Sequence, residues 1–181
     1  MPRTTFPVVV PYRLTGASNA IPTVQINAVA ENATQALVIG QSIATHWLRL
    51  NDAVATILVE RIKVGVPLEQ PGGPHLYLIG KVDIVQSLCF PTRIDSLPGE
   101  RLGEVLTGLD DKAMHAVLFD CSDLAFINTV GLTGLASHVK RLRIHLINVP
   151  PSVQKVLEIV GLGRYLSMFP NLEAALSAIP T

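Results

Sequence analysis

One hydroxyl group, on Thr129, stands where a predicted helix begins. Thr129 follows Asn128, a residue type that caps helix N-termini, and is followed by Val130, Gly131 and Leu132. Free backbone N–H groups and the helix dipole favour an anion at this position. A phosphate on Thr129 would add about −1.5 to −2 charges, enough to repel a partner docked there. These five residues are the predicted partner-binding site, and Thr129 is the predicted phosphorylation site.

Other patterns of catalytic or ligand-binding residues are missing from the sequence. There is no Ser–His–Asp arrangement and no glycine-rich phosphate loop followed by Lys-Ser or Lys-Thr. His138 could share a surface with Thr129 but is too far along the helix to act as its base. Cys89 and Cys121 lack metal-ligand spacing and are expected to be reduced thiols. Asp110-Asp111 is better explained as a charged turn than as a metal pair. We therefore expect no enzyme, no cofactor and no metal.

The composition favours a well-packed globular protein. Hydrophobic residues make up 49% of the 181 residues and charged residues 15%, which argues against disorder. The formal net charge is +0, so nothing in the totals calls for nucleic acid or an anionic membrane as a partner. The apolar stretches fall short of the roughly 20 residues that a bilayer span needs, which predicts no stable membrane insertion. The N-terminus lacks the features of a signal peptide, and a cytoplasmic location is expected.

The elements that would position Thr129 follow an alternating order in the second part of the chain. Ala116–Phe119 is an unbroken apolar run, typical of a strand buried on both faces, and it ends at Asp120. A helix over 132–139 and a strand over 144–149 are expected next. Capping residues and apolar periodicity then predict a helix from Ser152 to Gly161 and a last helix after Asn171. This order predicts an α/β layer fold.

The first part of the chain has a different pattern. Phe6–Val10 is a predicted edge strand among prolines, and two amphipathic helices are expected over 32–63 with a break near residues 49–52. A segment over 64–74, rich in proline and glycine, is the predicted linker. A strand over 75–79 and a helix over 99–109 follow it. We therefore divide the chain into an N-terminal extension, 1–64, and a domain, 65–181.

Three segments together resemble the STAS domain, an α/β module found in bacterial anti-sigma factor antagonists: Ala116–Leu132, Leu146–Leu162 and Leu172–Leu176. In that family a buried strand ends in Asp, and an Asp-Ser-Ser-Gly motif opens the next helix. The resemblance implies a mixed sheet of four to five strands with helices mainly on one face. Here that sheet would be preceded by the helical and extended N-terminal segment.

The resemblance also implies a function. An anti-sigma factor antagonist binds an anti-sigma factor, a serine kinase-type protein, and is released when a Ser or Thr of the motif is phosphorylated. Asn128-Thr129-Val130-Gly131 stands in the motif's place, so Thr129 would be the phosphorylated residue. Asn128 replaces the Asp and Val130 replaces the second Ser. In the alternative interpretation, Asn128 and Thr129 are only capping residues and the switch is lost.

Several alternatives remain open at this stage. The chain could be a STAS scaffold without a switch, a subunit of a stress-signalling, lipid-transport or transporter-associated assembly. Residues 32–64 faintly resemble the opening helices of the partner kinases, but a docking or dimerisation element, which would make a homo-oligomer, needs fewer assumptions. The basic residues Lys140, Arg141 and Arg143 are better explained by a helix C-terminus than by an anion site.

Overall fold

The chain begins with a β-hairpin whose alternating apolar residues face inward. The computed structural model describes residues 3–16, 21–51, 55–66, 68, 74–80, 84–109, 112 and 114–179. β1 (Thr4–Leu14) pairs antiparallel with β2 (Thr23–Ala30) along most of its length. Phe6, Val8 and Val10 are buried on one face of β1, as the period-two spacing of strand side chains requires.

One long helix covers this hairpin. α1 (Ala33–Leu50) begins at Asn32, whose side chain accepts a hydrogen bond from the backbone N–H of Gln35. A Cβ at Gly40 would lie 2.6 Å from the Val8 side chain, so glycine lets α1 approach β1 closely. The first of the two predicted helices is therefore confirmed.

The second predicted helix is wrong. Its residues form β3 (Ala55–Ile57), a 3-10 turn (Val59–Arg61) and β4 (Lys63–Val64), and both strands pair antiparallel with β1. The four-residue spacing of apolar side chains indicated a helix, but the run is rich in β-branched residues, which favour strands. For that helix the sequence offers Asn51 or Asp52 as the N-cap. Asn51 is instead the C-cap of α1, and Asp52 lies outside the described residues.

β1 is an inner strand, not the predicted edge strand, because β2 flanks it on one side and β3 and β4 on the other. Its prolines are tolerated for a local reason. The carbonyls of Pro7 and Pro11 accept bonds from Gly65 and Leu58, on the side of the short strands. The missing N–H groups of these prolines face that same side, so the long ladder with β2 loses no donor.

The second sheet is mixed and five-stranded, in the order β11-β10-β8-β5-β6. β8, β10 and β11 run parallel to one another, whereas β5 is antiparallel to both β8 and β6. The predicted mixed sheet of four to five strands is therefore confirmed. Its strands are β5 (His75–Gly80), β6 (Ile84–Cys89), β8 (Met114–Asp120), β10 (Ile144–Ile147) and β11 (Ser167–Phe169).

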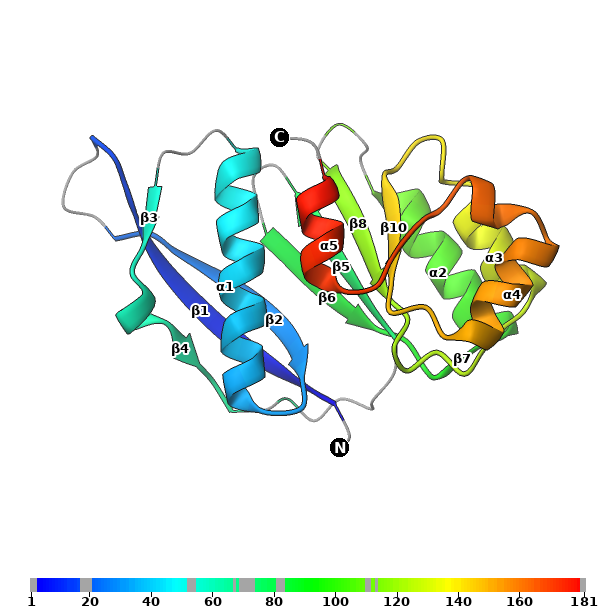
Figure 1. The fold of residues 1–181 in the computed structure, drawn as a ribbon, viewed down its shortest axis with the longest axis horizontal. Coiled ribbons are helices and arrows are strands. Elements are labelled where there is room, and N and C mark those ends of the chain that lie inside the picture. The colour runs from blue at the N-terminus through cyan, green and yellow to red at the C-terminus, as the bar shows by residue number, and fades with distance from the viewer. Residues whose placement is uncertain are drawn as a thin grey trace.

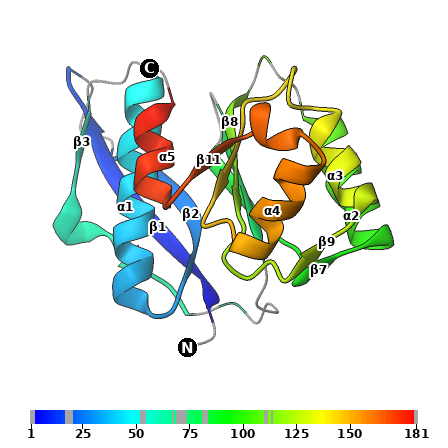
Figure 2. The same ribbon diagram turned by 45° about the vertical axis from the view of Figure 1, so that its right-hand side comes forward.

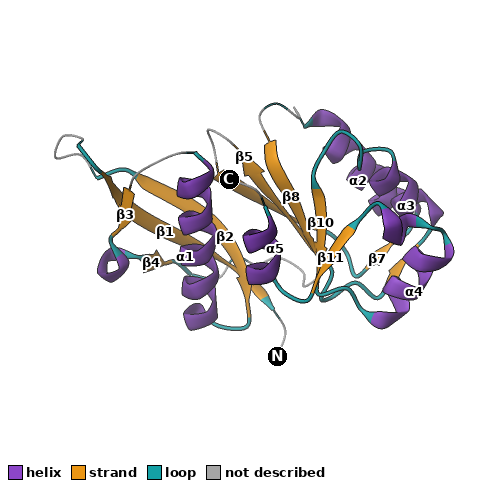
Figure 3. Cartoon of the chain, turned by 45° about the horizontal axis from the view of Figure 1, so that its top comes forward, coloured by secondary structure: helices purple, strands orange, loops and turns teal. Residues whose placement is uncertain are grey.

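Three helices cover one face of this sheet, and the C-terminal helix lies on the other (Figures 1 and 3). Val117 and Phe119 of β8 pack toward the first face, whereas Leu118 points to the opposite face, as alternation in a strand requires. The first face is covered by α2 (Ser96–Gly108), α3 (Thr129–Ala136) and α4 (Pro151–Ile159). The second face is covered by α5 (Leu172–Ala178), which follows β11, and a 3-10 turn (Leu162–Arg164) lies between α4 and β11.

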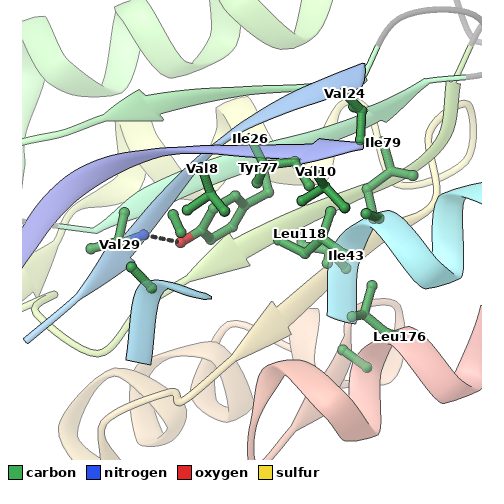
Figure 4. Packing of buried hydrophobic residues seen from close by; sticks show 14 of the residues in the cluster. Val8, Val10, Val24, Ile26, Val29, Ile43, Tyr77, Ile79, Leu118 and Leu176 are labelled. Carbon is green, nitrogen blue, oxygen red and sulfur yellow. Dashed lines mark hydrogen bonds between the residues drawn. The ribbon is translucent and has the colours of Figure 1, made fainter. Parts of the chain in front are cut away.

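The N-terminal hairpin and the second sheet share one hydrophobic core. α1 and α5 lie side by side over it, and β2 runs beside β6 (Figures 1 and 2). Tyr77 of β5 reaches across, and its hydroxyl oxygen accepts a hydrogen bond from the backbone N–H of Val29 at 3.1 Å (Figure 4). Val8, Ile43 and Leu118 belong to the same cluster of buried side chains as Tyr77. Residues on both sides of the predicted boundary at 64/65 therefore stabilise each other.

Candidate partner-binding site

A short parallel ladder places the starts of two helices next to each other. β7 (Arg93–Ile94) pairs with β9 (Phe126–Ile127), and each strand leads directly into a helix, α2 and α3 respectively. The backbone N–H of Asn128 continues the ladder by donating to the carbonyl of Ile94 at 3.1 Å. Figure 2 shows this pair of strands at the base of the two helices.

Asn128 caps α3, as the sequence predicts. Its side-chain oxygen accepts hydrogen bonds from the backbone N–H groups of Val130 at 3.0 Å and Gly131 at 3.3 Å. Thr129 is the first residue of the helix and is exposed. Asn128 and Val130 are half-buried, whereas Gly131 and Leu132 are buried. Of the five predicted site residues, Thr129 therefore offers the most accessible side chain.

Glycines allow close packing of α3 against β7 and α2. A Cβ at Gly131 would lie 2.7 Å from the Ile94 side chain, and one at Gly99 would lie 2.7 Å from the backbone nitrogen of Gly131. Gly134 and Gly103 continue the same contact one turn further along. These glycines bring the first turns of both helices together, so the surface around Thr129 is formed by two rigid helix ends.

Exposed apolar side chains lie at this end of the two helices. Leu97, in the first turn of α2, is 76% exposed, and Phe126, just before Asn128, is 38% exposed. The guanidinium of Arg93 lies 4.4 Å from the centroid of the Phe126 ring, a cation–π contact. A surface with an accessible hydroxyl, two exposed apolar groups and an arginine is suited to protein binding.

His138 forms hydrogen bonds with residues of α2 and α3. Its Nδ1 lies 2.7 Å from the carbonyl oxygen of Gly134, and its Nε2 lies 3.1 Å from the hydroxyl of Thr107 on α2. Both ring nitrogens are therefore engaged near the far end of α3. The structure agrees with the sequence that His138 is not placed to act as a base for Thr129.

A buried polar cluster connects the N-terminus to the second sheet. Asp120, the last residue of β8, forms an ion pair with Arg3, and it accepts hydrogen bonds from the backbone and hydroxyl of Ser122 and from the Asn148 side chain at 3.2 Å. Arg3 also lies 3.4 Å from Asp123. Asn148 follows β10 with φ 53°, a left-handed conformation that asparagine tolerates. Asp120 thus holds three parts of the chain together.

The pKa of Asp120 reflects two opposed effects. Burial raises the pKa of this carboxyl group, but the hydrogen bond and charge of Arg3, together with the bonds from Ser122, outweigh burial and leave the pKa below its usual value. Asp120 is therefore ionised at neutral pH and fully occupied by donors. The ionised carboxylate joins the N-terminal segment to the ends of β8 and β10.

This cluster forms part of the wall of an open groove of about 900 Å³ between α1 and the ends of β8 and β10. In open α/β sheets, ligands commonly bind outside the carboxyl ends of parallel strands, where this groove lies. This groove could not be predicted from the sequence because Arg3 and Asp120 are far apart in the chain. The only local signal was the Asp that ends a buried strand.

Burial disfavours the thiolate form of both cysteines. Burial raises the pKa of Cys121 far above its usual value, with the charge of Asp120 adding to the effect, and burial also raises the pKa of the half-buried Cys89.

Within the described ranges, no group of three or more His, Cys, Asp or Glu side chains is arranged to hold a metal ion. Asp110-Asp111 and Pro71 to Gly73 lie outside those ranges.

Comparisons with known proteins gave one match. The family model of the STAS domain matches residues 66–175. No curated protein and no solved structure matches the chain. Among the described residues, no helix has the length and apolar character needed to cross a bilayer.

Proposed function

Since this chain belongs to the STAS domain family, we propose that it is a regulatory, non-enzymatic protein of the anti-sigma factor antagonist type. STAS domains commonly mediate protein–protein interactions. The proposed partner is an anti-sigma factor, a serine kinase-type protein of the bacterial cytoplasm. It would dock on the first turns of α2 and α3, and phosphorylation of Thr129 would release it.

The observation that carries this proposal is the exposed hydroxyl of Thr129 as first residue of α3. Phosphate at a helix N-terminus is tolerated by the protein itself because N–H groups and the helix dipole face it. The same phosphate would be buried in a complex against an apolar partner surface, where its desolvation is costly. Charge at Thr129 would thus affect binding much more than folding.

A specific observation favours a second function, a STAS scaffold without a switch. The Asn128 side chain is engaged in capping, and Val130 lies beside α2, where a Cβ at Gly99 would come within 3.1 Å of it. Both departures from the family motif therefore have a structural role, and neither supplies a second hydroxyl or a carboxylate for kinase recognition.

The two functions are separated by substitutions at Thr129. The tagged protein is used to isolate its partner from the native host, and the purified partner is titrated with the parent, Thr129→Val and Thr129→Asp. We expect Thr129→Asp to weaken binding roughly tenfold or more, because a desolvated charge costs more than 1.4 kcal/mol. Thr129→Val should bind like the parent.

The matched control is Thr34→Asp, which makes the same change at an exposed position in the first turn of α1. It should leave the affinity unchanged. Equal affinities of Thr129→Asp and the parent would exclude the switch and favour the scaffold. Mass spectrometry of the protein from its host then reports whether Thr129 carries phosphate.

A further inference from the structure

A second concave surface lies at the other end of α3 from Thr129. The turn after α3 and the first residues of β10 enclose a groove of about 310 Å³ together with Tyr165 and Ser167. We call it the Lys140 groove; its lining residues are Val139, Lys140, Arg141, Leu142, Arg143, Ile144, His145, Tyr165 and Ser167. No carboxylate is among them, whereas three of them, Lys140, Arg141 and Arg143, are basic.

The basic residues of this groove have different roles. Arg141 donates to the carbonyls of Leu106 and Leu109 at 2.5 Å each, and so caps the C-terminus of α2. Lys140 and Arg143 are exposed, and in the described part of the chain neither has an ion-pair partner. Arg141 therefore has the expected helix-capping role. The charges of Lys140 and Arg143 are available to pair with an anion.

Neutral donors border the same groove. Tyr165 is 65% exposed and Ser167 is exposed, so both hydroxyl groups are accessible to a ligand. His145 adds a ring whose two nitrogens are buried without hydrogen-bond partners. Burial, and next the charge of Arg143, lowers the pKa of His145, which leaves it neutral at pH 7. Two cations and two hydroxyls around a small concavity provide the donors that a phosphate group requires.

An apolar surface adjoins the groove through Tyr165. Ile159 is 75% exposed and Val160 is 47% exposed at the end of α4, and both line a neighbouring hollow with Tyr165. The charged residues of that hollow are Arg164 and Glu158, and the Glu158 carboxylate accepts a hydrogen bond from Gln154. Exposed aliphatic side chains next to a basic concavity would contact the apolar portion of an anionic ligand. The adjacent polar and apolar parts match an amphiphilic molecule better than inorganic phosphate.

We propose that the Lys140 groove binds the phosphate group of an amphiphilic phosphate ester. Lys140 and Arg143 pair with the phosphate oxygens, Tyr165 and Ser167 donate hydrogen bonds, and the apolar part of the ligand lies along Ile159 and Val160. The ligand can be a free phosphate ester or the headgroup of an anionic phospholipid, because both present the same chemistry. The groove lies apart from Thr129, so this proposal is independent of the proposed switch.

The test measures binding of three probes to the full-length protein: inorganic phosphate, a soluble short-chain phosphatidic acid, and phosphatidylcholine vesicles containing phosphatidylglycerol. We expect the short-chain lipid to bind, inorganic phosphate to bind more weakly, and amide NMR shifts to concentrate at residues 139–145, 165 and 167. Vesicle binding would identify a membrane lipid as the ligand, whereas binding of the short-chain lipid alone would identify a free ester.

Charge-reversal variants test the residues that carry this proposal. Lys140→Glu with Arg143→Glu should weaken binding of the short-chain lipid roughly tenfold or more, since both cations that pair with the phosphate are replaced by anions. Lys63→Glu, at an exposed lysine of β4, should bind like the parent. Circular dichroism confirms that each variant is folded. Binding equal to the parent in the double variant, shifts centred elsewhere, or no binding of any probe would overturn the proposal.

Discussion

At the scale of single residues, the buried carboxylate of Asp120 is held by an ion pair with Arg3 and by hydrogen bonds from Ser122 and Asn148. Replacing Asp120 by Asn leaves Arg3 largely buried without its main counter-charge, although Arg3 keeps Asp123 at 3.4 Å. We expect Asp120→Asn to lower the free energy of unfolding at pH 7 by about 2 kcal/mol, somewhat less than for a fully buried pair. Urea unfolding of both proteins measures this difference.

The same pair predicts how the loss depends on pH. The pKa of Asp120 is lower in the folded than in the unfolded chain, where it is about 3.9. Its ionised form therefore stabilises the protein above pH 4, and this contribution is lost as the pH falls through the folded pKa. The difference between the parent and Asp120→Asn should shrink below about pH 4. A difference that stays constant from pH 7 to pH 3 would contradict this assignment.

Residue-scale features were predictable from the sequence where they are local. Asn128 and Thr129 were recognised because a cap and a first helical residue depend only on their neighbours in the chain. The pair of Arg3 and Asp120 was missed because it joins positions 117 residues apart, and no local pattern indicates such a contact. Whether Lys140 and Arg143 have an ion-pair partner among the described residues likewise depends on which carboxylates the fold brings near.

At the scale of elements, the contact between α2 and α3 sets the geometry around Thr129. Gly99→Ala would place a Cβ 2.7 Å from the backbone nitrogen of Gly131, which has no side-chain freedom to move away. We expect a loss of about 2 kcal/mol in the free energy of unfolding, as for other overpacked contacts. Differential scanning calorimetry measures the change.

Gly108→Ala is the matched control for this contact, because it lies in the same helix with no atom within 4 Å of its added Cβ. It should be neutral or stabilise the protein by up to about 1 kcal/mol, the usual advantage of Ala over Gly in a helix. If Gly99→Ala behaved like Gly108→Ala, the two helices would not be in the close contact described.

The elements also show where sequence reasoning succeeded and where it did not. Strand β8 was predicted because an unbroken apolar run is characteristic of a buried strand, and strands at the positions of β5 and β10 were also expected. The helix expected over 53–63 was wrong because tertiary pairing with β1 outweighed a four-residue apolar spacing. Local patterns could not show that β1 has partners on both sides.

At the scale of the whole molecule, the N-terminal hairpin and the STAS sheet form one core. Tyr77→Phe removes the acceptor for the buried N–H of Val29, and we expect a loss of about 1–3 kcal/mol. The variant should still unfold in a single transition, seen by Trp47 fluorescence in the first half and by far-UV circular dichroism for the chain. Two separate transitions would contradict the shared core.

The fold class and the family could be predicted from the sequence. The packing of the N-terminal hairpin against the STAS sheet in one core could not. The alternation of apolar residues shows which face of a strand is buried but does not name what covers it. Tyr77 and Leu118 were recognisable as buried strand residues, yet their packing against Val8 and Ile43 required the structure. The role of the N-terminal segment as a cover for the STAS sheet follows from this packing.

The central claim is that charge at the start of α3 controls partner binding. It is tested most directly by the ratio of the partner's dissociation constants for Thr129→Asp and the parent, measured at one ionic strength beside Thr34→Asp. A ratio of roughly ten or more for Thr129→Asp, with Thr34→Asp near one, is the expected result. A ratio near one for both variants would contradict the claim.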